Sequence, residues 1–552
     1  MMRQKRWFIT VWVVALCAFA VLHAAHLRAD FPNHSPWVTD WAKYTDEGWY
    51  GNAAIRARLS GNWYLRGDFN PAPAVPVWPF LEWLLFFVTG VSVTAARGLA
   101  VALFFASLLL SYFLLRTRGP QWMALLAVTL LVTSPFLYSF SRLAILEPLL
   151  ITLILVALNL AVRLPGFRRP ILVSAVIGLL FTLMVLTKTT AVFMLPALVW
   201  AIVLPLWRSR RMALGAPQGG LGPLGRKLIV RCVAAAGAAS AASFALWMAL
   251  VTHSGLLPDY EYLFFVNRYI KPAQFYWPLL SLGWALHGGL WIDRILFPLA
   301  AMMLLGACFA WFKGRARRLL LDPVFGASVL AIAGNLFFMT YQNHTQPRYF
   351  AVVAFFSFFM VAQATHAMLG DGHGQLQTHA RSSNWLGWLA LSLCAIAAGI
   401  NGAETLSYAT HPEYTFVNAA ERLTRYIDDH PNGKRLLVSV SGDEITLVTH
   451  LPALNDMFDG PGDDMPDLAA KLAFYQPGWY ACWNQLDAGA LEDLHSRYSV
   501  EQVASFRAFD DSSRNVLVLF KLHPWPGGQV YDPADQNLRG RFPEDKFDIP
   551  LR

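Results

Sequence analysis

The sequence predicts a polytopic α-helical membrane protein with a small α/β domain at its C-terminal end. Its 552 residues are 56% hydrophobic and only 14% charged, whereas soluble globular proteins carry roughly a quarter charged residues. Apolar runs of the length that crosses a bilayer recur up to about residue 402. Basic residues gather in every second connection between these runs, which is the pattern of cytoplasmic loops.

About eleven apolar runs are predicted to span the membrane. They lie near residues 7–27, 93–115, 121–139, 146–162, 170–187, 189–207, 229–252, 290–311, 319–341, 349–369 and 385–402. The N-terminus is basic, and so are the connections near residues 116–118, 163–169, 208–231 and 313–318. The N-terminus is therefore expected in the cytoplasm, and the tail after the last span is expected outside it.

Composition narrows the class of protein further. The net charge of +9 does not indicate nucleic acid binding, because the cations cluster between apolar runs, where membrane orientation requires them. Of five cysteines only Cys482 lies in the polar tail, so we expect no disulfide within it. Residues 1–25 also fit a cleaved signal peptide. We favour an uncleaved anchor, because the apolar stretch is long for a signal.

The chain is predicted to have two regions. Residues 1–402 form a transmembrane domain with two large extracytoplasmic loops, 28–92 and 253–289, and residues 403–552 form an extracytoplasmic domain. In this tail, KRLLVSVS and NVLVLFKL are typical of strands and AGALEDLHSRY is typical of a helix. The tail is therefore expected to be a small α/β domain.

An acidic pair marks the first outer loop. In KYTDEGWYGNAAIRARLSGNW, Asp46 and Glu47 open a helix-like segment. Thr45 or Asp46 would suit a helix N-cap, and carboxylates in a first turn complement the helix dipole. The same dipole is expected to lower the pKa of Asp46 and weaken it as a base. Other ionisable residues on the same side of the membrane favour a catalytic role over simple capping.

Three of these residues fall at span ends. Arg142 and Glu147 lie where the third and fourth spans meet outside, and Lys188 lies between the fifth and sixth spans. Ionisable groups at or inside a bilayer are costly and usually face a cavity. A helix cap at Glu147 and a snorkelling Lys188 are the structural alternatives.

The tenth span begins with a polar group. The stretch YQNHTQPRYFAVV places His344, Arg348 and Tyr349 at its outer start, where an interfacial aromatic–basic anchor would look similar. Weaker candidates on the same face are Arg97, Tyr262, Arg268, Tyr269 and Lys271.

Acids and cations on one outer face fit transfer of a sugar from a lipid carrier. Nucleotide-activated sugars are not expected outside the cytoplasmic membrane, so the donor would be a polyprenyl phosphate sugar. A carboxylate must take the acceptor proton, which suits Asp46, with Glu47 orienting the acceptor. Cations must neutralise the departing phosphate, which suits Arg348, Lys188 and Arg142. A single displacement with one base inverts the anomeric carbon.

The sequence resembles the GT-C membrane glycosyltransferases. DEGWYGNAAIRARLSGNW is similar to the acidic helix of a branch, glycosyltransferase family 39-like, that holds the protein O-mannosyltransferases and the lipid A aminoarabinose transferases. TGVSVTAARGLAVALF, SRLAILEPLLITL and QPRYFAVV resemble three later stretches of that branch, in the same order. The resemblance covers roughly residues 1–370.

The resemblance implies a GT-C-like fold and inverting transfer from a polyprenyl phosphate sugar, with Asp46 as base and Arg348 and Tyr349 near the donor phosphate. The candidate catalytic residues are Asp46, Glu47 and Glu147, and the candidate ligands of the donor phosphate are Arg348, Tyr349, Lys188, Arg142 and His344. Some members of the superfamily bind a divalent metal near the acidic pair, for which Glu47 and Glu147 are the candidate ligands. No other cofactor is expected.

Two features depart from the branch. Glu147-Pro148 stands where many relatives have Asp-Pro, and NPAPAVPVWPF lacks the lysine of their Lys-Pro-Pro stretch. A phosphate contact from that lysine cannot be carried over, which argues against an aminoarabinose transferase.

A transporter or lipid flippase is the alternative function. Its ionisable residues would lie near the bilayer midplane on broken helices, whereas here they lie at the outer ends of the spans. We therefore expect a glycosyltransferase of a bacterial inner membrane. Its partners would be a polyprenyl-phosphate sugar, membrane lipids, and a lipid, glycan or protein acceptor, without nucleic acid.

Overall fold

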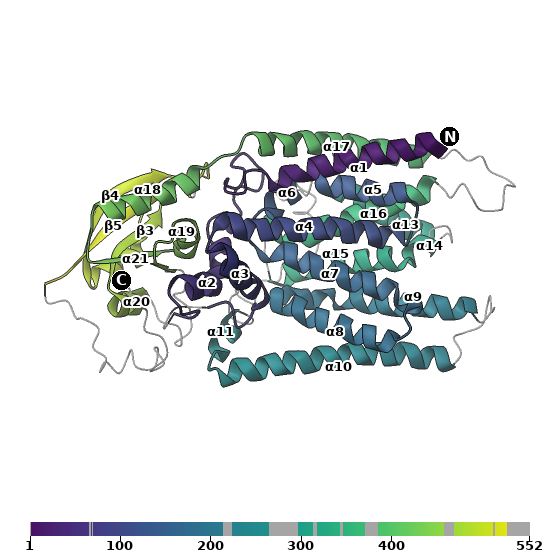
Figure 1. Cartoon of the computed structure of the whole chain (residues 1–552), viewed down its shortest axis with the longest axis horizontal. Helices are drawn as coiled ribbons and strands as arrows, with labels where there is room; N and C mark the ends of the chain where they lie inside the picture. The colour runs from purple at the N-terminus through teal and green to yellow at the C-terminus, as the bar shows by residue number, and fades with distance from the viewer. Residues whose placement is uncertain are drawn as a thin grey trace.

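The computed structural model describes residues 2–65, 68, 70–213, 223–263, 296–312, 317–342, 346–369, 385–456, 468–511 and 514–526. Long helices lie side by side in a bundle, and a sheet with its own helices sits at one end of it (Figure 1). Between bundle and sheet lie three helices from the two loops predicted to be extracytoplasmic (Figure 1), namely α2 (Asp46–Leu59), α3 (Val77–Thr89) and α11 (Leu257–Glu261).

The bundle is built from helices that follow the predicted apolar runs. They are α1 (Met2–Ala24), α4 (Val93–Arg116), α5 (Gln121–Val132), α6 (Pro135–Ser141), α7 (Leu146–Val162), α8 (Pro170–Thr187), α9 (Leu195–Ala213), α10 (Pro223–His253), α13 (Leu296–Phe312), α15 (Pro323–Gln342), α16 (Ala351–Leu369) and α17 (Trp385–Thr410). Short helical segments join or precede them, namely η1 (Trp41–Lys43), η2 (Leu164–Gly166), η3 (Thr189–Met194), α14 (Arg317–Leu320) and η6 (Pro347–Phe350).

Six helical stretches within the described residues are long and apolar enough to cross a membrane. They are α4, α8, η3 with α9, α10, η6 with α16, and the stretch Trp385–Asp429 that begins with α17. The bent pair α5 and α6 makes a seventh when taken as one span, and α1, α7, α13 and α15 contain shorter apolar helices. The polytopic helical class is therefore confirmed, while the count of eleven spans stays a prediction.

One predicted span, 121–139, is two helices that meet at an angle of 65°. α5 ends at Val132 and α6 begins at Pro135, whose ring cannot continue a helical hydrogen-bond ladder. The Ser134 hydroxyl caps α6 by accepting a hydrogen bond from Leu137 N at 3.0 Å.

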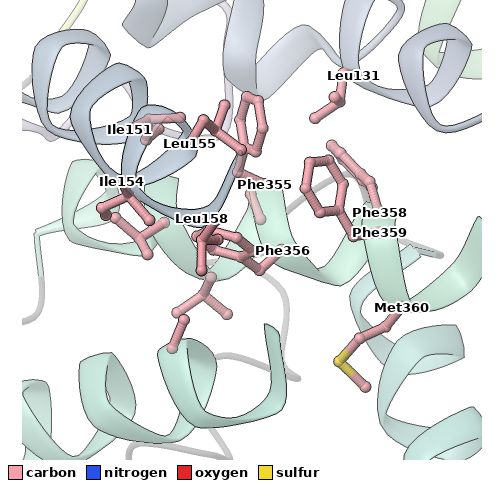
Figure 2. Packing of buried hydrophobic residues seen from close by; sticks show 14 of the residues in the cluster. Leu131, Ile151, Ile154, Leu155, Leu158, Phe355, Phe356, Phe358, Phe359 and Met360 are labelled. Atoms are coloured by element: carbon pink, nitrogen blue, oxygen red, sulfur yellow. The ribbon is translucent and has the colours of Figure 1, made fainter. Parts of the chain in front are cut away.

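α16 is the central helix of the bundle, because every residue from Ala351 to Thr365 is buried. α7 packs against it with one face, formed by Ile151, Ile154, Leu155 and Leu158, the spacing of one helical stripe. Figure 2 shows these side chains beside the phenylalanines of α16. The outer start of this buried helix is a rigid position for the polar residues that precede it.

The C-terminal region is a small sheet with helices on both faces. Its elements are α18 (Thr415–Asp429), β1 (Lys434–Ser439), α19 (Gly442–Thr449), β2 (Ala453–Leu454), α20 (Leu468–Tyr475), β3 (Pro477–Trp483), α21 (Ala488–His495), β4 (Tyr498–Arg507) and β5 (Val516–Pro524). The strand order is β2-β1-β3-β5-β4, with β1 parallel to β2 and β3, and β5 antiparallel to β3 and β4. The two predicted strands are β1 and β5, and the predicted helix is α21.

Alternating side chains of the strands form two cores. Leu517 and Leu519 of β5 face α18 and α19, while Val518 and Phe520 face α20 and α21, as the two-residue period of a strand requires. The domain boundary at residue 403 stays a prediction, since α17 continues through it to Thr410.

Candidate functional site

Arg348 is the centre of a buried polar cluster at the end of the bundle nearest the C-terminal sheet (Figure 1). It lies in η6, directly before the buried helix α16. Its Nη2 atom lies 2.9 Å from Oδ2 of Asp46. Its backbone N–H donates to Oδ2 of Asp40 at 2.8 Å, and Nη1 donates to the other oxygen of the same carboxylate. One guanidinium thus joins two carboxylates from the loop between α1 and α4.

Asp40 also shapes the loop that carries it. Its Oδ1 atom accepts a hydrogen bond from Ala42 N at 2.8 Å and so caps η1. The backbone N–H of Trp41 donates to Oε1 of Gln346 at 3.3 Å, which fastens η1 to the segment before Arg348. Sequence reasoning missed Asp40, although aspartate is among the residues preferred at a helix N-cap.

Asp46 opens α2 but does not cap it. The N-cap position is Thr45, whose side chain makes no capping bond and instead donates to Oδ1 of Asp46 at 3.0 Å. Burial raises the pKa of Asp46 above its ordinary value, and Arg348 opposes this shift. The lower pKa expected from the helix N-terminus is therefore wrong, because burial of the charge outweighs the dipole. A buried carboxylate with a raised pKa is a stronger base when ionised.

Glu147, Lys188 and Tyr349 adjoin this pair. Glu147 stands in the first turn of α7 and forms an ion pair with Lys188, which lies at the break between α8 and η3. The Lys188 Nζ atom is 4.5 Å from the centre of the Tyr349 ring, and the Arg348 Cζ atom is 4.9 Å from the same ring centre. Tyr349 therefore stands next to both cations, each of which has its own carboxylate partner.

Glu47 points away from this cluster, which corrects the expectation that both members of the acidic pair share one site. Arg97 binds both of its oxygens, with Nε to Oε1 at 2.8 Å and Nη2 to Oε2 at 2.5 Å. The backbone N–H of Ala144 donates to Oε1 at 2.7 Å. Arg97 also donates to the carbonyls of Leu27 and Ala29. Glu47 and Arg97 thus hold α2 against α4 and the start of α7.

Arg142 also lies apart from Arg348, contrary to its expected place among the phosphate ligands. Its Nη2 atom donates to the carbonyls of Ala25 and His26 at 2.6 and 2.7 Å. Its Cζ atom lies 4.6 Å from the centre of the Tyr138 ring. These contacts fasten the end of α6 to the chain that follows α1.

The weaker candidates divide into described and undescribed residues. Tyr262 is described and packs against Trp49 of α2. The others, Arg268, Tyr269 and Lys271, lie outside the described residues, as does His344.

The candidate metal ligands do not fit a metal ion. Glu47 is occupied by Arg97 and by a backbone N–H, and Glu147 is paired with Lys188. Among the described ranges, no group of three or more His, Cys, Asp or Glu side chains could hold a metal.

Sequence reasoning also missed a buried charge network between the first outer loop and the C-terminal domain. Arg56 of α2 lies 2.7 Å from Asp68 and 3.0 Å from Asp443 of α19. Lys471 of α20 lies 2.8 Å from Asp68. Arg56 and Asp443 are separated by 387 positions in the sequence, and Asp68 and Lys471 by 403. No local pattern in the sequence could therefore have paired them.

One stretch of the sequence matches a known family. Residues 71–218 match the family model for dolichyl-phosphate-mannose-protein mannosyltransferase. This stretch is less than half of the chain and excludes Asp46 and Arg348. No curated protein matches the sequence.

Solved structures are similar over nearly the whole chain. ArnT from Cupriavidus metallidurans in the apo state has a TM-score of 0.57 and 14% identity, over 93% of this chain and 98% of that one. ArnT bound to undecaprenyl phosphate gives a TM-score of 0.55 at 14% identity, over 92% and 98%. The oligosaccharyltransferase AglB from Archaeoglobus fulgidus gives 0.49 at 13% identity, over 86% and 70%. The likeness to ArnT shows that the two chains share a fold.

Proposed function

We propose that this chain, a membrane glycosyltransferase of the GT-C type by its fold and its family match, transfers a sugar from a polyprenyl phosphate donor. The acceptor is a hydroxyl group of a lipid, glycan or protein on the extracytoplasmic face, and the anomeric carbon is inverted. The solved structure of ArnT with undecaprenyl phosphate supports this class of donor.

The observation that carries the proposal is the buried pair of Asp46 and Arg348 at 2.9 Å, with Lys188 and Glu147 beside it. Arg348 pairs with both Asp40 and Asp46, and Lys188 pairs with Glu147, so each cation has at least one carboxylate partner. A phosphate that binds here competes with the carboxylates for Arg348 and Lys188. Asp46 is then free to accept a proton.

The reaction follows from these side chains. Asp46 accepts the proton of the acceptor hydroxyl while the hydroxyl oxygen attacks the anomeric carbon from the face opposite the phosphate. The bond between that carbon and the phosphate oxygen breaks, and its electron pair leaves with the polyprenyl phosphate. Arg348 and Lys188 stabilise the charge that develops on this leaving group. One displacement with one base gives inversion.

The distribution of charge supports an enzyme over a transporter or flippase. A transporter is expected to hold its ionisable residues near the middle of the membrane on broken helices. Here Asp46, Glu147 and Arg348 lie in first turns or short helical segments next to the loops predicted to be extracytoplasmic.

The proposal is tested by incubating purified protein with undecaprenyl phosphate linked to mannose, glucose, galactose or N-acetylglucosamine. A lipid extract of the producing cells supplies acceptors, and mass spectrometry detects the products. We expect one donor to release undecaprenyl phosphate and glycosylate an acceptor. Asp46→Asn should lower the rate by about 10²- to 10⁴-fold, the usual contribution of a general base. Asp428→Asn, at an exposed aspartate paired with Arg435, is the matched control.

The outcomes separate the roles of the two partners. Full turnover by folded Asp46→Asn protein removes Asp46 from the mechanism. Arg348→Ala should weaken the binding of undecaprenyl phosphate by about tenfold or more, because it removes a charged hydrogen-bond donor. An unchanged dissociation constant rejects the phosphate role of Arg348.

A further inference from the structure

The first turn of α2, which carries Asp46, lacks a cap from its own sequence. A helix N-cap normally accepts a hydrogen bond from the backbone N–H of the second or third helical residue. Thr45 occupies the N-cap position but makes no such bond. Its hydroxyl donates instead to the carbonyl of Trp41 and to Asp46.

The missing cap comes from the C-terminal domain. Gly48 is the third residue of α2, and its N–H donates to Oε2 of Glu444 on α19 at 2.8 Å. Glu444 is completely buried. The Glu444 carboxylate, 396 positions away in the sequence, thus accepts the capping hydrogen bond that the Thr45 side chain does not accept.

The close approach of α19 to α2 depends on glycine at this place. A Cβ atom on Gly48 would lie 2.2 Å from the backbone carbon of Asp443 and 2.3 Å from the nitrogen of Glu444. No side chain fits in that space, so the backbone of α19 rests directly on the first turn of α2. This contact leaves Glu444 little freedom to lose its bond to Gly48.

A second attachment holds the other end of α2. Arg56, in the last turn of the helix, pairs with Asp443 at 3.0 Å. Both ends of α2 are therefore fixed to α19. Asp46, which forms the ion pair with Arg348, lies at the first of these ends.

We infer that Glu444 is a positioning residue for the proposed base: by accepting the Gly48 N–H it fixes the first turn of α2 and so aligns Asp46 with Arg348. The inference rests on the proposed function, in which Asp46 takes the acceptor proton. The bond that Glu444 accepts comes from the backbone of Gly48, so its effect on Asp46 passes through the first turn of α2. The C-terminal domain thereby becomes part of the machinery of transfer.

The key comparison is between Glu444→Ala, which removes the acceptor, and Glu444→Gln, which keeps an oxygen in the same place. Burial and repulsion by Glu47 raise the pKa of Glu444 well above its ordinary value. A neutral amide is therefore a close replacement. Glu501→Ala, at an exposed glutamate of β4 in the same domain, is the control for loss of a carboxylate.

Two readouts report on position. Hydrogen exchange at the Gly48 amide should be about tenfold faster in Glu444→Ala than in the unchanged protein, as for loss of one helix cap. With the undecaprenyl phosphate sugar that is turned over, kcat should fall roughly ten- to hundredfold, the effect of a small misplacement of a catalytic group. The dissociation constant for undecaprenyl phosphate should stay within about twofold, because Arg348 remains in place. Glu444→Gln should restore both exchange and kcat.

The result that overturns the inference is normal kcat in Glu444→Ala, or a Glu444→Gln variant as slow as Glu444→Ala. If Glu444→Ala does not fold, Glu444→Asp replaces it, because its shorter side chain cannot reach Gly48. Fast exchange with normal kcat in that variant also overturns it. If Asp46→Asn keeps full turnover, the proposed function fails, whatever Glu444 does. If Asp46→Asn is inactive and Glu444→Ala is fully active, only the positioning role fails.

Discussion

At the scale of the residue, two neighbouring carboxylates have separate tasks. Asp46 pairs with Arg348 and Glu47 pairs with Arg97. Successive positions on a helix point about 100° apart, so an adjacent acidic pair rarely serves one site. The sequence identified both acids and both cations, because ionisable residues stand out at the ends of apolar spans. It could not show which acid pairs with which cation, because Glu47 and Arg97 are 50 positions apart and Asp46 and Arg348 are 302 positions apart. Only the fold brings such distant residues together.

A buried aspartate outside the proposed site should contribute to how stability depends on pH. Asp259 of α11 accepts hydrogen bonds from the Tyr64 hydroxyl and the Asn70 N–H, and burial raises its pKa from 3.8 to about 6. The folded protein then binds more protons than the unfolded chain between about pH 4 and 6. The ionisation of Asp259 therefore destabilises the fold as pH rises through this window, by about 3 kcal/mol when complete.

Asp259→Asn removes this ionisation while keeping a polar side chain that both neighbours can bond. Thermal unfolding in detergent should show the variant and the unchanged protein alike near pH 4. The variant should become the more stable of the two as pH rises to 7. A constant difference between the two melting curves across this range contradicts the prediction.

At the scale of the element, apolar runs were easier to predict than the breaks within them. The run 121–139 is continuous in hydropathy, yet Ser134 and Pro135 divide it into α5 and α6. The strands β2, β3 and β4 were missed as well. β2 has only two residues, and β3 is buried along its whole length, without the alternation that identifies a strand with one exposed face.

Helices α8 and α10 pack so closely that a small residue is required between them. A Cβ atom on Gly178 of α8 would lie 2.0 Å from the carbonyl oxygen of Ala236 on α10. Hydroxyl groups of Thr182 and Ser240 bond across the same contact at 3.0 Å. Such small-residue contacts are a main source of helix association in membranes.

Gly178→Ala should therefore force α10 away from α8 and destabilise the protein by about 1–3 kcal/mol. The measurement is thermal unfolding in detergent. Gly237→Ala on α10 is the matched control, because nothing lies within 4 Å of its added Cβ atom. That variant should be neutral or slightly more stable, since alanine favours helix over glycine. Equal melting temperatures for the two variants reject the close-packing argument.

At the scale of the whole molecule, the charge pattern of the loops predicts which end of the bundle faces the cytoplasm. Exposed Arg168 lies between α7 and α8, in a loop predicted to be cytoplasmic, and exposed Glu501 lies on β4 of the C-terminal domain. In a chain with Cys17 and Cys308 replaced by alanine, single cysteines at these two positions report the orientation.

We expect a membrane-impermeant maleimide to label Glu501→Cys in intact inner-membrane vesicles of right-side-out orientation. Arg168→Cys should be labelled only after the vesicles are opened. Labelling of Arg168→Cys alone in intact vesicles would reverse the assigned sidedness. Labelling of both cysteines would indicate leaky vesicles. Leakage is excluded when a cytoplasmic marker enzyme in the same vesicles stays inaccessible to external reagents.

The dependence of α2 on Glu444 has a consequence for synthesis of the chain. The Gly48 N–H emerges from the ribosome 396 residues before its acceptor. At about 5–20 residues per second, that interval is roughly 20–80 s. In the predicted orientation, the first loop is outside the membrane during this interval, and the first turn of α2 still lacks the hydrogen bond to Glu444. If the positioning role holds, an incompletely synthesised chain does not transfer sugar from the lipid carrier. Activity begins only when the C-terminal domain has been exported and has docked against α2.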